Sequence, residues 1–371
     1  MKTVSYNLHV AMLACPFCVL NSNSKIPHTL TMPSNNAAYI AEPKKIPLEV
    51  KSAPWTEPKD NQILVRNHAV AINPVDIVIQ QFAAFEVKYP AIIGTDVAGV
   101  VESVGPGVSH FKPGDRVLGY ATSLGSKDNA EGAFQEYTLI RSDCASHIPD
   151  DLPFEQATVL PLAVATASYA FFGDDTLQLR LPSLNPDKID EVVLVWGGSS
   201  SVGGTAIQLA KAAGYQVITT ASPRNHEYVK RLGADHALDY KSSKVVDEVA
   251  QLLQGKKLAG VLDAIGAPDA ISTAAKAVEH ADGKRHIVCV RAPPENLPAS
   301  VKAQPILSLS IYKNSLASQI FNEFVPKALA QGKLKAEPKA EIVGEGLDKI
   351  QAGLDKLRDG VSATKVVVRL K

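Results

Sequence analysis

Residues 191–203 read EVVLVWGGSSSVG, an apolar run followed directly by a loop of glycine and serine. The run 191–196 has the length and the β-branched content of a buried strand. Residues 203–213 have a helical composition, and Gly214 closes that helix. A strand, a tight turn and a helix in this order begin a β-α-β unit. The stretch therefore predicts an α/β fold with a parallel sheet.

The segments after this unit repeat the alternation of strand and helix. Further strands are predicted at 215–220, 236–239, 258–265 and 285–290, with helices at 224–232, 244–253 and 270–278 between them. Regular alternation implies right-handed crossovers. We therefore expect a doubly wound parallel sheet with helices on both faces.

The loop after the first strand predicts a dinucleotide site. Against the pattern G-x-G-x-x-G, Gly198 and Gly203 match the first and third glycines, and Ser200 replaces the middle one. Small residues let the backbone approach a pyrophosphate, and the helix N-terminus offers N–H groups. A serine at position 200 either reflects less crowding of the backbone or directs its hydroxyl at a phosphate. For the loop as a whole, the alternative is a tight turn that binds no ligand. The predicted cofactor contacts here are Gly198, Ser199, Ser200, Ser201, Val202 and Gly203.

The end of the second strand indicates which dinucleotide binds. NAD sites place Asp or Glu about 20 residues after the loop, to bond the ribose 2′-hydroxyl. Residues 219–225 read TTASPRN, and no carboxylate occurs before Glu227. Ser222 and Arg224 suit a 2′-phosphate, so NADPH is the predicted cofactor. The alternative is that Ser222 only caps a helix that begins at Pro223; the two roles are compatible.

The first part of the chain predicts a small barrel. Strands are expected at 62–70 and at 94–101, and a further strand with its turn at 132–137, with glycine- and proline-containing turns at 104–107 and 112–117. Short strands punctuated in this way are typical of closed β-structures.

Two further segments lie outside this pattern. Residues 154–172 are rich in Ala and Leu and predict helices. The C-terminal segment predicts a helix at 347–357 and a strand at 365–370. We expect this strand to join the first domain, which is then discontinuous in sequence.

Composition restricts the class of protein. The 371 residues are 46% hydrophobic and suit two folded domains. Lys and Arg together number 38, as do Asp and Glu, so the zero net charge gives no electrostatic basis for binding nucleic acid or an anionic membrane. No apolar run reaches the roughly 18 residues of a membrane span.

The N-terminal residues 1–31 differ from the rest of the chain. Lys2 precedes an apolar stretch that Pro16 interrupts, and Met32 offers an alternative start. The segment is either a disordered or spurious extension or a targeting signal. Its Cys15 and Cys18 form a C-x-x-C, which is a redox pair, half a zinc site or a fortuitous pair. With four cysteines in all, a reducing cytoplasm is the expected location.

The motifs over 94–99 (GTDVAG), 112–117 (KPGDRV) and 198–203 resemble, in this order, the medium-chain dehydrogenase/reductases. Within them the chain is most similar to the quinone oxidoreductases and the fungal trans-acting enoyl reductases of polyketide pathways. The resemblance covers roughly 33–371. It implies a GroES-like barrel domain over 32–165 and 315–371, a Rossmann domain over 166–314, and an active-site cleft between them.

The departures from the zinc alcohol dehydrogenases bear on chemistry. Where those enzymes carry their first zinc cysteine and a Gly-His-Glu, this chain has the runs 72–76, INPVD, and 94–96, GTD, and it lacks the cysteine-rich zinc lobe. Without thiolate or imidazole ligands we expect no metal. Conjugate reduction needs none, so the predicted reaction is hydride transfer to an enone, an enoyl group or a quinone.

The resemblance also implies site residues. Asn73 and Asp76 are expected beside the nicotinamide ribose or the substrate carbonyl, Pro161 and Leu162 at the substrate, and Thr166, Ser222, Arg224, Asn225, Tyr240, Val290, Lys365 and Val366 at the cofactor. Alternatives stay open for three of them. Asn73 is also a plausible strand-end turn residue, Thr166 a threonine bonded to its own helix, and Tyr240 a strand-end aromatic.

The identity of the proton donor is open. Tyr120 is the candidate from position, with water or an ordinary core tyrosine as alternatives. An NADPH-binding protein with little turnover, as in the zeta-crystallins, is the second function to consider. The oligomeric state is open between a homodimer through the sheet edge and a monomer. A monomer has to be considered because Pro293, Pro294, Pro298 and Pro305 crowd that edge and remove hydrogen-bond donors.

Overall fold

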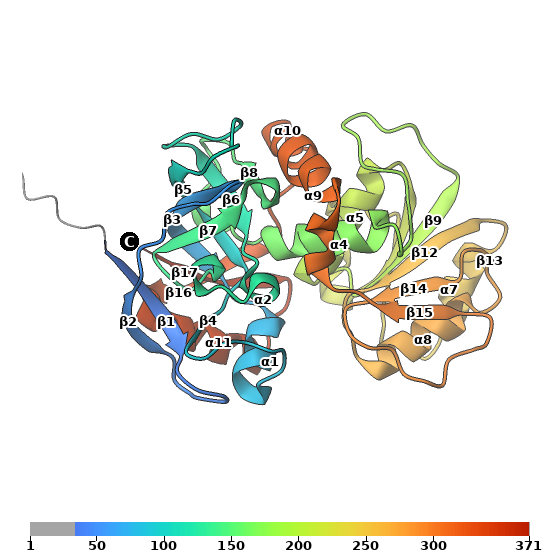
Figure 1. Cartoon of the computed structure of the whole chain (residues 1–371). Coiled ribbons are helices and arrows are strands. Elements are labelled where there is room, and N and C mark those ends of the chain that lie inside the picture. The colour runs from blue at the N-terminus through green and yellow to red at the C-terminus, as the bar shows by residue number, and fades with distance from the viewer. Residues whose placement is uncertain (1–33, 371) are drawn as a thin grey trace, which may run out of the picture. The chain divides into compact units, whose positions relative to one another are not determined.

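The computed structural model describes residues 34–370, so the predictions for residues 1–31, with Cys15 and Cys18, fall outside it. Two β-structures carry the described chain, one built largely from antiparallel strands and one from parallel strands (Figure 1). Helix α4 follows the antiparallel strands of the first part and precedes the parallel strands in sequence, and two C-terminal strands return to the first part.

The barrel-like part contains a seven-stranded sheet in the order β16-β17-β3-β5-β6-β8, with β7 paired to β3, and a three-stranded sheet in the order β2-β1-β4. Its strands are β1 (Asn35–Ile40), β2 (Glu49–Ala53), β3 (Gln62–Ala71), β4 (Ala91–Ile92), β5 (Asp96–Val104), β6 (Arg116–Tyr120), β7 (Tyr137–Arg141), β8 (Ala145–His147), β16 (Lys339–Glu345) and β17 (Thr364–Arg369). Its helices are α1 (Pro74–Phe82), α2 (Ser123–Ser126), η1 (Asn129–Glu131), η2 (Ser142–Cys144), α3 (Phe154–Ala157), η6 (Leu347–Lys349) and α11 (Ile350–Asp359).

The second part is a parallel sheet in the order β11-β10-β9-β12-β14-β15, with β13 paired to β12. Its strands are β9 (Glu191–Trp196), β10 (Gln216–Thr220), β11 (His236–Leu238), β12 (Lys257–Asp263), β13 (Asp282–Gly283), β14 (His286–Cys289) and β15 (Lys302–Pro305). Its helices are α5 (Ser201–Ala212), η3 (Pro223–Asn225), α6 (His226–Arg231), α7 (Val245–Leu253), α8 (Pro268–Val278) and η4 (Ser308–Lys313). Helix α4 (Pro161–Phe172) precedes this part in sequence, and α9 (Leu316–Ser318), the π-helix η5 (Gln319–Phe324) and α10 (Val325–Ala330) follow it. The predicted doubly wound parallel sheet is confirmed.

The C-terminal strand pairs where the sequence predicted. β17 runs antiparallel to β3, with Val367 opposite Ala71, and parallel to β16. The last residues of the chain therefore complete the sheet that its first part begins. The domain limits 32–165, 166–314 and 315–371 themselves stay a prediction.

One local prediction was placed imprecisely. Within 132–137, where a strand with its turn was predicted, the strand begins only at Tyr137, because the Gln135 side chain donates to the Gly132 carbonyl at 2.7 Å and holds the preceding residues in a turn. The helices predicted within 154–172 are two, with a break before Pro161. Pro161 has no N–H to continue a helix, but it suits the first position of a new one.

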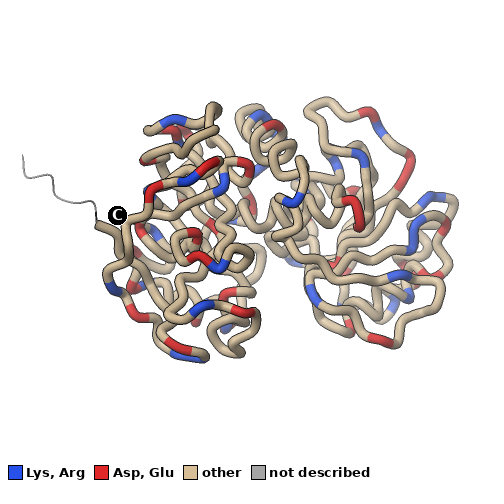
Figure 2. Tube along the Cα trace, viewed as in Figure 1, with Lys and Arg blue, Asp and Glu red and all other residues tan. Residues whose placement is uncertain are grey.

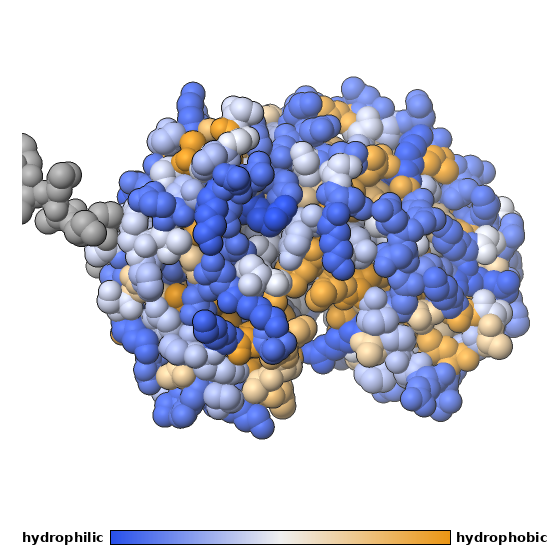
Figure 3. Space-filling model, viewed as in Figure 1, coloured by the Kyte–Doolittle hydropathy of each residue, from blue (hydrophilic) through white to orange (hydrophobic). Residues whose placement is uncertain are grey.

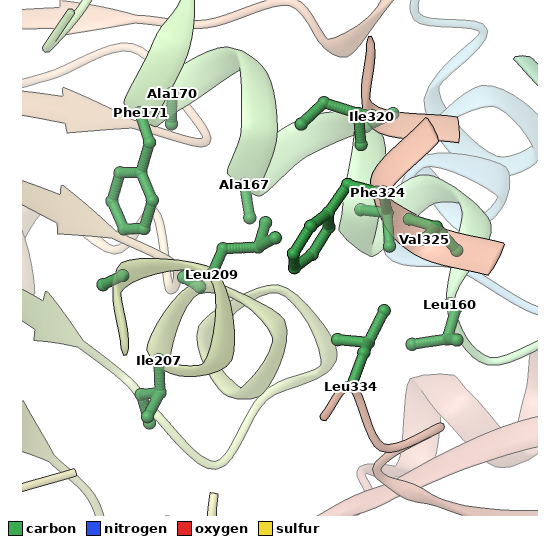
Figure 4. Close-up of a cluster of buried hydrophobic side chains, with 14 of the residues drawn as sticks. Leu160, Ala167, Ala170, Phe171, Ile207, Leu209, Ile320, Phe324, Val325 and Leu334 are labelled. Atoms are coloured by element: carbon green, nitrogen blue, oxygen red, sulfur yellow. The ribbon is translucent and has the colours of Figure 1, made fainter. Parts of the chain in front are cut away.

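One apolar core runs beneath both parts and holds them together. It includes Ala71 and Leu118 of the antiparallel sheet and Leu209 of α5. Figure 4 shows where α4, α5 and the α9–α10 segment meet, with Ala167 and Phe324 at the contact. Buried apolar area of this kind is the main stabilising contribution to a fold. The cleft above this core therefore has well-packed walls.

The distribution of charged residues and the hydropathy of the helices agree with what the composition indicated. Basic and acidic residues are interspersed along the trace in Figure 2. Within residues 34–370, no helix has both the length and the apolar character needed to cross a membrane.

Candidate active site

A cleft with a volume of about 1210 Å³ lies between the antiparallel part and the carboxyl end of the parallel sheet. Trp196, Thr220 and Ala264 line it from the ends of β9, β10 and β12, and Asn73, Tyr120 and Val366 line it from the other side. Figure 3 shows hydrophobic side chains gathered in the hollow between the two parts. Ligands of open parallel sheets bind outside the carboxyl ends of the strands, so this is the candidate active site.

The glycine–serine loop forms one wall of the cleft. Ser199, Ser201 and Val202 line it, and Ser200 is the N-cap of α5. The Ser200 hydroxyl accepts from the Gly203 N–H at 3.0 Å and donates to the Gly197 carbonyl at 2.9 Å. This hydroxyl therefore orders the loop from within, and Ser200 also lines the cleft, so its contact with a phosphate stays a prediction. The backbone N–H groups at the start of α5 remain the anion-binding feature.

The two glycines of the loop serve packing. Neither Gly198 nor Gly203 lines the cleft, although both were predicted to contact the cofactor. A Cβ atom at Gly198 would lie 2.1 Å from Thr219 Oγ1, and one at Gly203 would lie 2.2 Å from the Gly197 carbonyl oxygen. The strand, loop and helix approach so closely that only glycine fits.

Gly203→Ala is expected to lower the free energy of unfolding by about 1–3 kcal/mol, because the added methyl group must displace the Gly197 backbone. The same displacement is expected to weaken dinucleotide binding about tenfold, measured by quenching of Trp196 fluorescence. Gly204→Ala is the matched control, since the nearest atom to its Cβ would be Leu232 Cδ1 at 3.0 Å and the Gly198 carbonyl oxygen would lie at an ordinary contact distance of 3.5 Å. Equal losses in both variants would contradict the packing role of Gly203.

An arginine without a protein partner lies beyond the end of β10. Arg224 is exposed, lines the cleft, and makes no hydrogen bond or ion pair with any of residues 34–370. Ser222 is the N-cap of η3, but its side chain makes no capping bond, so its hydroxyl is also free. Tyr240, 44% exposed, lines the same region. Asn225 lines it too, with its amide bonded to Ser362 Oγ at 3.1 Å.

The charged residues that line the cleft are mostly basic. They are Arg224, Arg291, Lys365 and, as the single carboxylate, Asp269. This excess of positive charge favours an anionic ligand.

Asn73, Thr95, Asp96 and Lys365 form a buried polar cluster. It includes the residues that stand where zinc alcohol dehydrogenases have metal ligands. Asn73 Nδ2 donates to Thr95 Oγ1 at 2.9 Å and to Asp96 Oδ2 at 2.7 Å. Lys365 Nζ donates to Asn73 Oδ1 and lies 2.9 Å from Asp96 Oδ2. Asp96 Oδ1 accepts from the Leu162 N–H at 2.6 Å. One carboxylate thus ties α1, α4 and β17 together at the floor of the cleft.

This cluster does not fit a zinc ion. Its carboxylate is already paired with an ammonium group, and its other members are an amide and a hydroxyl. Zinc prefers thiolate, imidazole and free carboxylate ligands. Within residues 34–370, His, Cys, Asp and Glu nowhere form a group of three able to hold a metal ion.

Asp76 does not reach the cleft, contrary to its predicted contact with the cofactor. Its side chain is fully buried and Oδ2 accepts from the Asn73 N–H at 2.8 Å. Asn73 is the N-cap of α1 and Asp76 the third residue of that helix, so this bond orders the helix start. Burial, and secondarily the charge of Asp96, raises the pKa of Asp76 to about 7, although Lys365 opposes the shift.

Asp76→Asn is expected to remove a pH dependence of stability. Because the folded-state pKa of about 7 exceeds the ordinary aspartate value of 3.8, the folded wild type binds more protons than the unfolded chain between these values. Its stability therefore falls as pH rises from about 4 to about 7. The asparagine variant should gain on the order of 4 kcal/mol over wild type across this range. Urea unfolding at several pH values measures the difference in free energy of unfolding between the variant and wild type. A difference that does not change with pH would contradict the prediction.

Most of the remaining predicted residues lie at the cleft. Thr166, Leu162, Val290, Val366 and Lys365 all line it. Pro161 does not, because its ring is buried at the first position of α4, so the predicted substrate contact is wrong for this residue.

The hydroxyl of Tyr120 is already engaged in a hydrogen bond. The residue lines the cleft but is 1% exposed, and its hydroxyl is bonded to Ser308 Oγ at 2.8 Å. Burial raises the pKa of Tyr120 well above the ordinary tyrosine value. Its role as proton donor stays a prediction.

Sequence reasoning missed three residues of the site. Thr95 was considered only as the replacement for a zinc-ligand histidine, and Ser308 and Arg291 were not singled out. The polar run 94–96 at the start of a strand was the one available signal for Thr95. Ser308 and Arg291 lie in loops that carry no motif.

Comparisons with known proteins agree with this architecture. The chain matches the family "Alcohol dehydrogenase GroES-like domain" over residues 59–150 and the family "Zinc-binding dehydrogenase" over residues 201–330. Dehydrogenase azaJ of Aspergillus niger is 42% identical, with 91% of this chain and 100% of that protein covered. Trans-enoyl reductase himH of Aspergillus japonicus is 38% identical, with 91% and 97% covered.

A solved quinone oxidoreductase from Pseudomonas syringae pv. Tomato DC3000 superposes with a TM-score of 0.70 at 25% identity, covering 90% of this chain and 99% of that one. The predicted barrel-plus-Rossmann architecture and the predicted resemblance are both confirmed. With a GroES-like part, a parallel sheet that binds NAD(P) and a cleft between them, the chain belongs to the medium-chain dehydrogenase/reductase family of oxidoreductases.

Proposed function

We propose that this protein is an NADPH-dependent reductase that transfers hydride, without zinc, to an activated C=C of an enone or enoyl group or to a quinone. The observation that carries the proposal is the unpaired Arg224 beside Ser222 at the end of β10. A guanidinium free of protein partners and a free hydroxyl suit the 2′-phosphate that distinguishes NADPH from NADH.

The acceptor class follows from the polar cluster and from the relatives. Asn73, Thr95, Asp96 and Lys365 offer hydrogen bonds but no zinc site, so a reaction that spreads charge onto a carbonyl fits better than one that needs a metal alkoxide. Relatives carry the names trans-enoyl reductase and quinone oxidoreductase. A place in a fungal secondary-metabolite pathway is part of the proposal.

NADPH supplies the hydride when it is bound. The N-terminus of α5 holds its pyrophosphate, and Arg224, Ser222, Asn225 and Tyr240 surround its adenosine end. Thr166, Val290, Lys365 and Val366 contact its nicotinamide end, and Leu162 contacts the acceptor. We also propose the domain limits 32–165 with 315–371 and 166–314 for the catalytic and cofactor domains.

Two measurements on the full chain test the function. Titration by Trp196 fluorescence should show tighter binding of NADPH than of NADH. NADPH consumption should then appear with a panel of enones, enoyl thioesters and quinones. Preference for NADH, or zinc required for turnover, would overturn the proposal, and NADPH binding without turnover on the whole panel would favour a non-catalytic binding protein.

A further inference from the structure

The amide of Asn73 has no free N–H group for a bound acceptor. Its two amide hydrogens are used by Thr95 Oγ1 at 2.9 Å and by Asp96 Oδ2 at 2.7 Å. Lys365 defines the orientation of this amide, because an ammonium group only donates and must face the amide oxygen. Asn73 therefore positions its neighbours, and donation to a substrate has to come from one of them.

Thr95 has the free proton. Its Oγ1 accepts from Asn73, and none of residues 34–370 accepts the Thr95 hydroxyl hydrogen. The side chain lines the cleft although the residue is only 3% exposed. The hydroxyl is thus a donor held in a largely desolvated place by a bond to its own oxygen. A hydrogen bond in such surroundings is stronger than one in water.

Lys365 has a second donor. Its ammonium carries three N–H groups, and two of them go to Asn73 Oδ1 and to Asp96 Oδ2. The third has no partner within residues 34–370, and Lys365 lines the same cleft while 5% exposed. Thr95 contacts the amide nitrogen of Asn73 and Lys365 contacts its amide oxygen, and both residues line the same cleft.

We propose that the Thr95 hydroxyl and the free N–H of Lys365 bind the carbonyl oxygen of the acceptor and stabilise the charge that develops on it. This inference rests on the proposed function. Hydride from NADPH forms the new C–H bond at the β-carbon, the π bond breaks, and its electron pair moves through the α-carbon to the carbonyl oxygen. The two donors hold this enolate oxygen. The α-carbon then takes a proton from water, the C=O bond reforms, and the products are the saturated carbonyl compound and NADP⁺.

Aligned donors at a developing oxyanion are often the largest single contribution to catalysis. The surroundings support this role, since both donors are fixed by bonds to Asn73. Little reorganisation is then needed when the charge appears.

Thr95→Val is the decisive variant, because it keeps the shape of the side chain and removes the hydroxyl. We expect kcat with an enone to fall about 100-fold, the loss typical of one oxyanion donor, while the KM for NADPH stays nearly constant. Thr95→Ser restores the hydroxyl and should recover most of kcat. Thr158→Val is the matched control, since Thr158 is buried, has no bond to its hydroxyl and does not line the cleft.

A binding measurement gives a readout without turnover. 4-Nitrophenol with NADP⁺ mimics the enolate, and its absorbance reports the ionised fraction. Wild type and Thr158→Val should increase the fraction of bound phenolate at fixed pH, Thr95→Val should not, and Thr95→Ser should do so again. If wild type reduces enones with NADPH while Thr95→Val keeps both kcat and phenolate binding, the donor site is overturned and the proposed function stands. If wild type reduces no acceptor, the function fails, and the phenolate titration alone decides the donor site.

Discussion

Arg224→Ala is expected to weaken NADPH binding about 10- to 100-fold and to leave NADH binding nearly unchanged. Hydrogen bonds to charged groups contribute about 1.5–3 kcal/mol each, which corresponds to this range. The guanidinium has no protein partner to lose, so the substitution should not lower stability. Competitive titration of NADPH and NADH against Trp196 fluorescence measures both affinities.

Lys230→Ala is the control for this prediction. Lys230 is an exposed cation six positions away, pairs with Glu227 at 3.2 Å and does not line the cleft. A general electrostatic attraction would make both variants lose similar affinity, whereas a specific 2′-phosphate contact affects Arg224 alone. Added salt should lower the ratio of NADPH affinity to NADH affinity in wild type, because Arg224 is exposed and salt screens its charge. Equal losses of NADPH and NADH affinity in Arg224→Ala would contradict the assignment.

Lys365→Met is expected to lower the free energy of unfolding by about 3–5 kcal/mol at neutral pH. The salt bridge between Lys365 and Asp96 is buried, with side chains 5% and 0% exposed, and breaking such a pair leaves one charge without compensation. Urea unfolding followed by circular dichroism measures the change. A loss below about 1 kcal/mol, the value of an exposed pair, would contradict it.

The double variant Lys365→Met with Asp96→Asn tests the cause. An uncharged amide at position 96 can still accept from the Leu162 N–H, so the tie between β5 and α4 can persist without a buried charge. Much of the lost stability should return. If the double variant is as unstable as Lys365→Met, packing of the lysine side chain is the larger effect.

The parallel part of the fold could be predicted closely because its signals are local. Apolar runs such as 192–195 and helix ends such as Gly214 lie within a few residues of the elements they define. The start of the strand near 132–137 has the opposite character, because it depends on a side-chain contact. Gln135 bonds to backbone carbonyls nearby and holds a turn, so the strand begins only at Tyr137.

From the amino-acid sequence alone we could predict the order of strands and helices, the glycine–serine loop and the absence of an acidic residue at the end of β10. These features are written in contiguous residues, and local sterics and periodicity translate them directly into structure. They were enough to predict the fold class and to favour NADPH.

Which polar side chains keep an unused hydrogen-bond donor depends on the packing of the folded chain. Asn73 and Lys365 are separated by 292 positions, and Tyr120 and Ser308 by 188. Hydrogen bonds between such distant residues depend on how whole elements pack, and no local pattern encodes them. Packing uses both N–H groups of Asn73 and the hydroxyl of Tyr120, and it leaves Thr95, Lys365 and Arg224 with donors to offer.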